Sequence, residues 1–248
     1  LVALCIRALT LPGAWAGVEF FVIPDWSRVN TETVNAALSQ AFFSLSLGMG
    51  ALLTYGSYLS RSERLPSVAM WVTSLDTVIA LLAGFLILPA VFAFGYDPAA
   101  GPGLTFVTLP AVFAKMPGGG LFGPVFFALL SVAAITSAVS LLETVVAYAI
   151  DETSSNRKPA TLAMGVVVFF IGVPSALSFG PWSDFKLFGK TFLDLMDYLA
   201  SNLLLPFGGI AIAVFVGWAV SQRMMTEVFG GATLPARVWL WMLRTVAP

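Results

Sequence analysis

The chain has 248 residues, of which 58% are hydrophobic and only 10% are charged, and its formal net charge is −1. Its mean hydropathy of +0.92 is higher than a water-soluble domain of this size sustains, because a soluble surface must be wetted. The near-neutral charge gives no reason to expect a nucleic-acid partner. The single cysteine, Cys5, and the absence of histidine exclude an internal disulfide, histidine–metal sites and Ser–His catalysis. The composition predicts an all-α polytopic membrane protein.

Both ends of the chain lie in apolar segments. Leu1 lies in an apolar run without a preceding Met or the basic flank of a signal peptide, and Pro248 closely follows an aromatic segment, 238–243. We therefore expect the chain to be a fragment of a longer polytopic protein.

Apolar runs near or above the roughly 20 residues that a bilayer requires predict five complete membrane spans with a partial span at each end. The span 34–59 differs from a plain anchor because Ser39–Gly50 places serines and two glycines at its centre. Gly costs a helix interior about 1 kcal/mol relative to Ala, and unwound backbone persists in lipid only where it lines a cavity or is buried in protein. We predict a broken helix whose exposed backbone groups bind a ligand. The expected helical segments are 1–9, 34–59, 66–94, 121–150, 160–177, 191–220 and 235–248.

The remaining segments are expected to connect these spans. Residues 10–33 predict an outer loop with short interfacial pieces, and residues 95–120 predict a long loop with a short helix over 104–114.

The last complete span, 191–220, contains a second group of helix breakers. Pro206, Gly208 and Gly209 predict a break in this helix as well.

Positive charge is denser on one side of the predicted spans. The loops on that side are short, whereas the opposite loops are about twice as long and carry fewer cations, so we expect the denser side to be cytoplasmic. The cations on that side are Arg61, Arg64, Arg157, Lys158, Arg223 and Arg237.

Several stretches have the order and spacing of motifs in one known membrane protein family. They are Gln40–Ala51, Leu53–Tyr58, Phe106–Phe113, Ala133–Ser137, Asp194–Asp197 and Leu234–Arg237. Over essentially its whole length the chain resembles the neurotransmitter:sodium symporter family, and it is most similar to the prokaryotic amino-acid transporters of that family.

The resemblance implies a fold of two five-helix repeats with inverted topology, in which substrate and sodium bind between the broken helices one and six. It assigns helices six to ten to this chain, with parts of five and eleven, and so makes the chain the second repeat. The missing helices one to five of the same protein would complete the binding site. The expected location is the plasma (inner) membrane of a prokaryote.

The resemblance also assigns substrate-binding residues, which composition alone would equally interpret as a packing face of small residues. The residue at Phe43 is an aromatic lid in the family and, with Ser46, holds the amino group of the substrate. Met49 shapes the side-chain pocket, where many relatives carry an aromatic residue. The slimmer Met leaves room for a bulky or aromatic substrate side chain. Ser137 and Leu141 match further positions of this pocket.

Two sodium sites are implied, each only partly contained in this chain. Ser44 and Asp76 match the first site, where oxygen ligands suit a hard cation. An aspartate within a span otherwise marks an ion path or a residue that reaches the interface. Ala133, through its carbonyl, Thr136 and Ser137 match the second site and share one helical face. Without the family, these hydroxyls would be expected to bond backbone carbonyls of their own helix.

Chloride dependence is not expected. Chloride-dependent relatives bind the anion with residues that match Gln40, Ser44, Asp76 and Ala80. Ala80 offers no hydroxyl, and the carboxylate of Asp76 would repel an anion.

Three residues match positions that gate access to the site. Asp197 matches an outer-gate carboxylate, and Asp151 matches an inner-gate carboxylate, each paired in the family with an arginine outside this chain. Tyr58 resembles part of the inner network. Thr191 and Asp194 instead have the spacing of a helix N-cap.

The predicted function is therefore sodium-coupled symport of an amino acid, neutral and with room for a bulky hydrophobic or aromatic side chain, by alternating access. The alternative is a proton-coupled transporter of the same architecture, with Asp76 or Glu143 as the proton carrier; Glu143 has no other assigned role. An intramembrane aspartyl protease needs two aspartates that share one site. Asp194 and Asp197 lie on a single helix, so no enzyme activity is expected.

Overall fold

The computed structural model describes residues 1–60, 63–98, 101, 103–178, 180–219, 228–229 and 234–245. Among these residues the regular structure is helical, and the extended pairing is confined to one isolated bridge between Leu187 and Lys190. The all-α prediction is therefore confirmed. Of the sequence predictions, the loop cations Arg61 and Arg223 and the end of the expected segment 235–248 lie outside the described residues.

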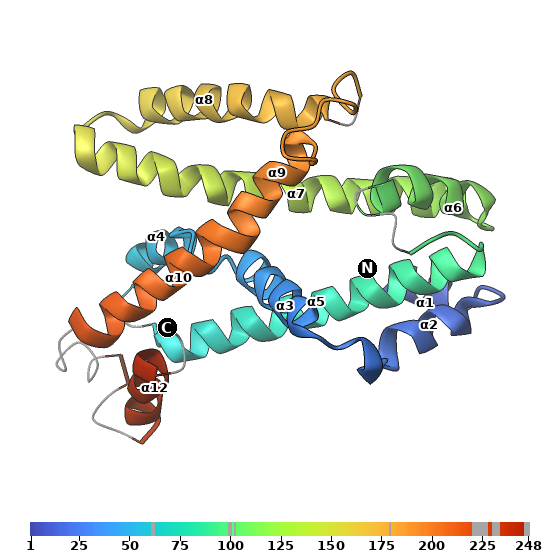
Figure 1. Cartoon of the computed structure of the whole chain (residues 1–248), viewed down its shortest axis with the longest axis horizontal. Coiled ribbons are helices and arrows are strands. Elements are labelled where there is room, and N and C mark those ends of the chain that lie inside the picture. The colour runs from blue at the N-terminus through green and yellow to red at the C-terminus, as the bar shows by residue number, and fades with distance from the viewer. Residues whose placement is uncertain are drawn as a thin grey trace. The chain divides into compact units, whose positions relative to one another are not determined.

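The helices follow one another in the order shown in Figure 1. The chain contains both short helices and long apolar ones, and the segments labelled η are short 3-10 or π helices. Their bounds are α1 Val2–Leu9, α2 Ala14–Val22, η1 Trp26–Arg28, α3 Thr31–Ser44, α4 Ala51–Tyr58, α5 Leu65–Ala93, η2 Leu104–Thr108, α6 Leu109–Lys115, α7 Gly119–Thr153, α8 Arg157–Leu177, α9 Phe192–Tyr198, η3 Leu199–Leu204, α10 Leu205–Val214, η4 Phe215–Ala219 and α12 Leu234–Thr245.

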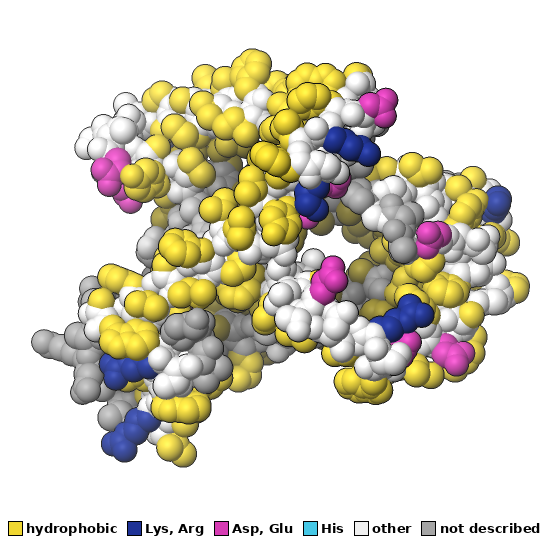
Figure 2. All heavy atoms as spheres, viewed as in Figure 1, with side chains coloured by type: hydrophobic (Ala, Val, Ile, Leu, Met, Phe, Trp, Pro, Cys, Tyr) yellow, Lys and Arg dark blue, Asp and Glu magenta, His cyan; other side chains and the backbone are white. Residues whose placement is uncertain are grey.

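Four of the described helical segments are long and apolar enough to cross a membrane: α5, α7, α8 and the continuous segment Phe192–Ala219. In α8 only 6% of the most apolar window is buried within the chain, and hydrophobic side chains cover its visible surface (Figure 2). A soluble fold would not leave so much apolar surface in water. These helices therefore meet lipid or other membrane-embedded protein.

The chain divides into two compact units. The first unit contains Leu1–Val29 and Thr73–Ser137, and the second contains Asn30–Val72 and Ala138–Pro248.

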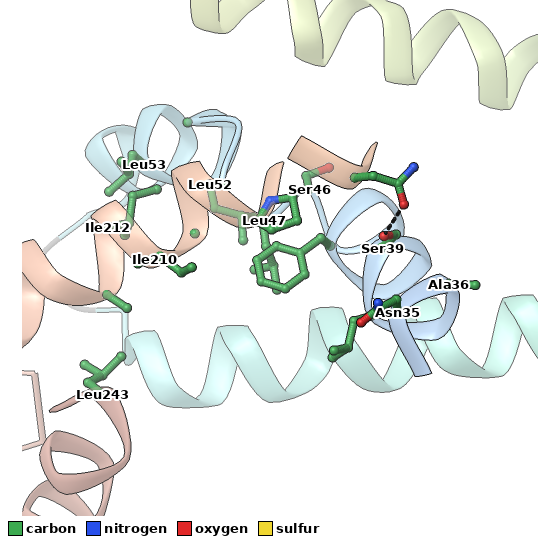
Figure 3. A pocket seen from close by; sticks show the side chains of 18 of the residues that line it. Asn35, Ala36, Ser39, Ser46, Leu47, Leu52, Leu53, Ile210, Ile212 and Leu243 are labelled. Atoms are coloured by element: carbon green, nitrogen blue, oxygen red, sulfur yellow. Dashed lines mark hydrogen bonds between the residues drawn. The ribbon is translucent and has the colours of Figure 1, made fainter. Parts of the chain in front are cut away.

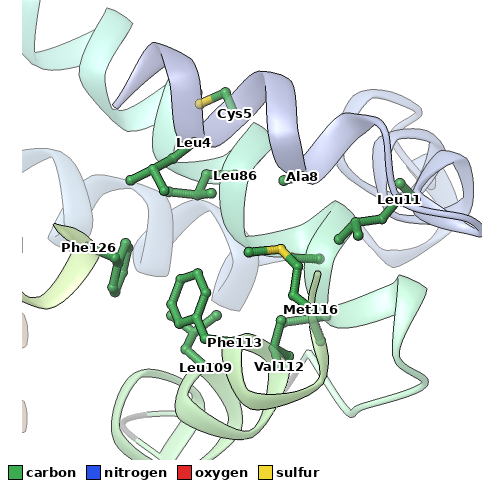
Figure 4. Packing of buried hydrophobic residues seen from close by; sticks show 13 residues of the cluster. Leu4, Cys5, Ala8, Leu11, Leu86, Leu109, Val112, Phe113, Met116 and Phe126 are labelled. Carbon is green, nitrogen blue, oxygen red and sulfur yellow. The ribbon is translucent and has the colours of Figure 1, made fainter. Parts of the chain in front are cut away.

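The first unit has a hydrophobic core built from helices distant in sequence. Figure 4 shows α1, α5 and α6 contributing side chains that point toward one another. Val91 and Val112 are fully buried at its centre, and Phe113 packs against Phe126 with ring centroids 5.4 Å apart. The cluster consists of Leu4, Cys5, Ala8, Leu11, Ala14, Leu86, Ala90, Val91, Leu109, Val112, Phe113, Met116 and Phe126.

In the same unit, α2 lies against α5 through glycines. A Cβ at Gly17 would lie 2.6 Å from both the carbonyl oxygen of Leu88 and the Cα of Pro89, and a Cβ at Gly84 would lie 2.3 Å from the ring of Phe21. Small residues of this kind let membrane helices approach closely. Residues 14–22, predicted only as an interfacial piece, therefore form a helix that is tightly docked.

The turn after α2 is fixed by a side-chain cap. The Asp25 carboxylate accepts hydrogen bonds from the hydroxyl and the backbone N–H of Ser27 and pairs with Arg28 at 3.0 Å. These hydrogen bonds stabilise the charged carboxylate and lower the pKa of Asp25 below its usual range.

The second unit contains the broken helix that was predicted within 34–59. Its first half, α3, begins three residues earlier than expected because Asn30 caps it. The Asn30 side chain accepts from the N–H of Thr33, and Thr33 interacts in return with the backbone N–H of Asn30. The break at Leu45–Gly50 separates α3 from α4. The prediction of a broken helix is confirmed.

The predicted second break, at Pro206, Gly208 and Gly209, is wrong. The chain stays helical from Phe192 to Ala219, with π-helical turns at η3 and η4 on either side of α10. A proline inside an α-helix removes one hydrogen bond and clashes with the carbonyl of the preceding turn. Here Pro206 occupies the first turn of α10 directly after the wider π turn η3. The wider turn accommodates the proline without interrupting the helix.

The glycine contact of α2 leads to a stability prediction. Gly17→Ala forces a methyl group into the backbone of α5, and overpacking of this kind costs about 1–3 kcal/mol. We expect the thermal midpoint of the full-length protein in detergent to fall by roughly 2–10 °C. Gly165→Ala on α8 is the matched control, because a Cβ there meets nothing within 4 Å. Equal midpoints for the two variants would contradict the docking of α2.

Candidate functional site

The helix break has a defined backbone geometry. Ser46, Gly48 and Gly50 have positive φ angles of 54°, 79° and 81°. α3 ends in a Schellman motif, in which the N–H of Ser46 donates to the carbonyl of Phe43 and the N–H of Leu47 donates to the carbonyl of Phe42. The left-handed position of that motif is usually glycine, and a serine there costs about 1 kcal/mol. Strain of this kind gathers at functional sites.

The break leaves backbone polar groups available. In the described part of the chain, the N–H groups of Gly48, Met49 and Gly50 find no hydrogen-bond acceptor. Unpaired backbone groups within the hydrocarbon region are costly unless they line a cavity or meet a ligand.

A cavity of about 1290 Å³ lies beside the break within the second unit. Figure 3 shows its walls: Ser39 belongs to α3, Leu52 and Leu53 to α4, and Ile210 to α10. Ser46 and Leu47 from the break itself also line the cavity.

The cavity is polar toward α3 and η3 and apolar toward α12. The Ser39 hydroxyl donates to Oδ1 of Asn202 at 3.2 Å (Figure 3). The ammonium group of Lys190 lies over the ring of Tyr198, 5.2 Å from its centroid. Trp239 and the leucines supply the apolar end.

The predicted substrate residues are placed as follows. Ser46 lines the cavity, whereas Phe43 and Met49 do not. Phe43 is the next-to-last residue of α3 and is 53% exposed. Leu141, on α7 in the same unit, is also exposed, and Ser137 belongs to the first unit. Of the predicted substrate residues in the second unit, Ser46 is the one that lines this cavity.

The predicted sodium residues fall in both units. Ser44 ends α3 in the second unit, and Asp76 is half-buried within α5 in the first. The hydroxyl of Thr136 donates to the carbonyl of Ala133 at 2.8 Å, so these two predicted ligand groups already lie side by side on α7. An intrahelical hydrogen bond is what the sequence alone favoured, although it was expected to reach the i−4 carbonyl and this one reaches the i−3 carbonyl.

The predicted outer-gate residue Asp197 is exposed on α9, and its carboxylate accepts from the Ser201 hydroxyl at 3.1 Å. The predicted N-cap is confirmed: the N–H of Asp194 donates to the Thr191 hydroxyl at 3.2 Å. Asp194 is thus a helix-capping residue.

On the other side of the break, α4 contacts α7 through polar side chains. The phenol of Tyr55 donates to the Ser140 hydroxyl at 2.9 Å, and a Cβ at Gly50 would lie 3.1 Å from the methyl group of Thr144.

Glu143, which sequence analysis left without a role, lies at the centre of a three-residue network. The Tyr58 phenol donates to one carboxylate oxygen of Glu143 at 2.6 Å, and the Arg157 guanidinium donates to the other. The Glu143 side chain is only 14% exposed. Asp151, the predicted inner-gate carboxylate, forms no ion pair in the part of the chain that the structure describes.

Sequence reasoning placed Tyr58 in an inner network but missed this partner. Arg157 follows Glu143 by fourteen residues and lies at the start of the next helix, α8. The 3.6-residue repeat relates residues of one helix, so it could not predict this contact. A charged residue inside a predicted span was the available signal, because such residues are normally paired.

Comparison with known proteins agrees with this architecture. The family model described as the sodium:neurotransmitter symporter family matches residues 1–248. The crystal structure of MhsT in complex with L-phenylalanine superimposes with a TM-score of 0.94 and 45% sequence identity, covering 100% of this chain and 57% of that chain.

Among curated relatives, the uncharacterized sodium-dependent transporter YhdH of Bacillus subtilis is 38% identical over 251 residues, which cover 100% of this chain and 56% of the relative. The sodium-dependent transporter MJ1319 of Methanocaldococcus jannaschii is 37% identical over 237 residues, with 92% and 46% covered. The sodium- and chloride-dependent glycine transporter 2 of Xenopus laevis is 29% identical, with 87% and 27% covered.

This chain spans about half the length of the curated relatives it matches. The all-helical structure, the break and the superposition identify it as the second inverted repeat of the two-times-five-helix transporter fold. Its apolar helices and prokaryotic relatives place it in the plasma membrane as a multi-pass protein. The chain belongs to the sodium:neurotransmitter symporter family.

Proposed function

We propose that the protein containing this chain is a sodium-coupled amino-acid symporter that works by alternating access. The observation that carries the proposal is the break at Leu45–Gly50, where a membrane helix opens its backbone beside a cavity. Half-helix ends and unwound backbone at the midplane are how this transporter architecture binds ions and charged substrate groups.

The proposed substrate is a neutral amino acid with a bulky hydrophobic or aromatic side chain. Phe43 and Ser46 hold its amino group, and Met49, Ser137 and Leu141 form the wall around its side chain. The proposal is supported by the L-phenylalanine bound to MhsT, a protein 45% identical to this chain, and by the flexible Met49 at the pocket position.

Two sodium ions drive the transport in this proposal. Ser44 and Asp76 contribute oxygen ligands to one, and the Ala133 carbonyl with the hydroxyls of Thr136 and Ser137 contributes to the other. Hydroxyl, carbonyl and carboxylate oxygens suit a hard cation. The expected helices one to five of the same protein supply the remaining ligands.

Coupling requires sodium to favour the outward-facing state that binds substrate. Asp197 then closes the outer side, and Asp151 with Tyr58 closes the inner side. The network at Glu143 belongs to that inner closure, because it ties the end of α4 to α7 and to the start of α8.

The network also weighs against Glu143 as a proton carrier. A carboxylate that accepts from a guanidinium and a phenol is stabilised in its charged form. Proton transport through Glu143 would first have to break both contacts, so the proton-coupled alternative would have to use Asp76 as its carrier.

The central experiment is uptake by the full-length protein reconstituted in liposomes. Tryptophan, tyrosine and phenylalanine should enter with higher kcat/KM than alanine or glycine, because the wide pocket buries more of their apolar surface. Replacing external sodium by potassium at constant pH should abolish this uptake. Uptake that survives without sodium, or a preference for small aliphatic amino acids, would contradict the proposal.

A second prediction concerns Asp76 and chloride. Asp76→Ala removes a charged sodium ligand and should raise the sodium concentration for half-maximal uptake by at least about tenfold, as expected for a lost charged contact. Replacing chloride by gluconate should leave wild-type uptake unchanged. Asp97→Ala, outside the long apolar helices, serves as the control. Chloride-dependent uptake would refute this assignment.

A third prediction tests the inner network by a double-mutant cycle. Tyr58→Phe and Glu143→Gln should each lower the free energy of unfolding by about 1 kcal/mol. The double variant should lose less than the sum by roughly 0.5 kcal/mol or more, because the two changes remove one shared interaction. Thermal unfolding of the full-length protein measures all three. Tyr148→Phe is the control, since that tyrosine is 68% exposed on the same helix α7. If the double variant loses the sum of the two single losses, the hydrogen bond between Tyr58 and Glu143 makes no net contribution to stability.

A further inference from the structure

The helix break touches α10 backbone to backbone. Gly48 has a positive φ, and a Cβ added to it would lie 2.2 Å from the carbonyl oxygen of Leu205 and 2.9 Å from the nitrogen of Gly209. From the other side, a Cβ at Gly208 would lie 2.2 Å from the carbonyl oxygen of Gly48. At these distances the two backbones leave no space for any side chain.

The adjacent glycine makes a contact of a different kind. A Cβ at Gly209 would lie 2.3 Å from the ring edge of Phe42, in the last turns of α3. That atom belongs to the far end of a side chain, which can turn away, whereas the carbonyl of Gly48 belongs to the main chain. Gly208 and Gly209 therefore support the break by contacts that respond differently to substitution.

We propose that Gly208 is a positioning residue for the binding site. It makes no predicted contact with substrate or sodium. Instead, the close approach that its missing side chain allows sets the distance between α10 and Gly48. That distance in turn sets the direction of the unpaired N–H groups at Gly48–Gly50. This inference rests on the proposed function, because it assigns those groups to ligand binding.

The position of Gly208 in the chain gives the contact a second consequence. Gly208 and the proposed outer-gate residue Asp197 lie in one continuous helical segment, Phe192–Ala219. The other half of the broken helix, α4, is held separately by Ser140 and Glu143 of α7. The break at Leu45–Gly50 thus contacts, on one side, the helical segment that carries the proposed gate residue Asp197. On the other side, α4 holds it to α7.

The experiment compares alanine variants of the full-length protein in liposomes, with radiolabelled L-phenylalanine as the probe. Gly208→Ala should raise KM for L-phenylalanine and the half-saturating sodium concentration by roughly tenfold, as a backbone displaced by overpacking would require. The sodium-induced rise in thermal midpoint, a binding readout independent of transport, should shrink with it. Gly172→Ala on α8, where a Cβ meets nothing within 4 Å, should match wild type in all three measurements.

A rescue variant separates positioning from general damage. Gly209→Ala should impair L-phenylalanine affinity, and Phe42→Leu should restore it by removing the ring edge. The same Phe42→Leu change should not rescue Gly208→Ala, whose methyl group meets main chain. If Gly208→Ala does not fold, the rescue of Gly209→Ala by Phe42→Leu still decides whether α10 positions the break.

The outcomes are distinct. Wild-type affinity in Gly208→Ala, or no rescue of Gly209→Ala by Phe42→Leu, would overturn the inference. If the wild-type protein shows neither sodium-dependent uptake nor a sodium-induced rise in midpoint, the proposed function fails. In that case the thermal midpoints still test the packing. If Gly208→Ala and Gly209→Ala both lower the midpoint and Phe42→Leu restores only Gly209→Ala, α10 packs against the break as described but has no role in binding.

Discussion

The structure depends on one constraint: a main-chain polar group placed in a membrane must find a partner. Over most of the chain, regular helices meet this requirement through their own backbone hydrogen bonds. At Leu45–Gly50 the requirement is met only in part. The Schellman bonds at Phe42 and Phe43 satisfy the end of α3, while the following N–H groups stay open. A helix that ends this way within a membrane protein is stable only if something else completes it, and the proposed substrate and ions are what we expect to do so.

The two halves of the broken helix are attached to different neighbours. α3 and the break contact η3 and α10, and α4 is tied to α7 and α8 through Tyr55, Tyr58 and Glu143. Both sets of contacts meet at the same six-residue break, Leu45–Gly50. In the proposed transporter this division would give alternating access a physical form. The break lies between α10, whose helical segment carries the proposed outer-gate residue Asp197, and the network at Glu143 that is proposed to close the inner side.

Sequence predicted the helical class and the break because both follow from local rules. Apolar length predicts spans, and the cluster of Ser46, Gly48 and Gly50 predicts unwinding. The interactions that remained hidden are those between segments far apart in the chain. Glu143 meets Tyr58 across 85 positions, and no local pattern encodes that meeting. The error at Pro206 has a different, local origin. Helix breakers predicted an interruption, but the π turn η3 directly before Pro206 accommodates the proline within a continuous helix. The roles of Ser44, Asp76, Ala133, Thr136 and Ser137 in sodium binding remain predictions from the family resemblance, as do the gating roles of Asp151 and Asp197.

The π turn at η3 changes the relative orientation of the side chains that precede and follow it in this helix. Asp197 precedes it and Gly208 follows it, so side chains on the two sides do not share the usual 3.6-residue repeat. A wider turn carries one extra residue, and each residue of an α-helix rotates the chain by about 100°. Loss of a single residue within Leu199–Leu204 would therefore turn the carboxylate of Asp197, the proposed gate residue, to another face of the helix while leaving Gly208 against Gly48. The orientation of the proposed gate residue Asp197 relative to the helix break thus depends on the number of residues in one helical turn as well as on their identity.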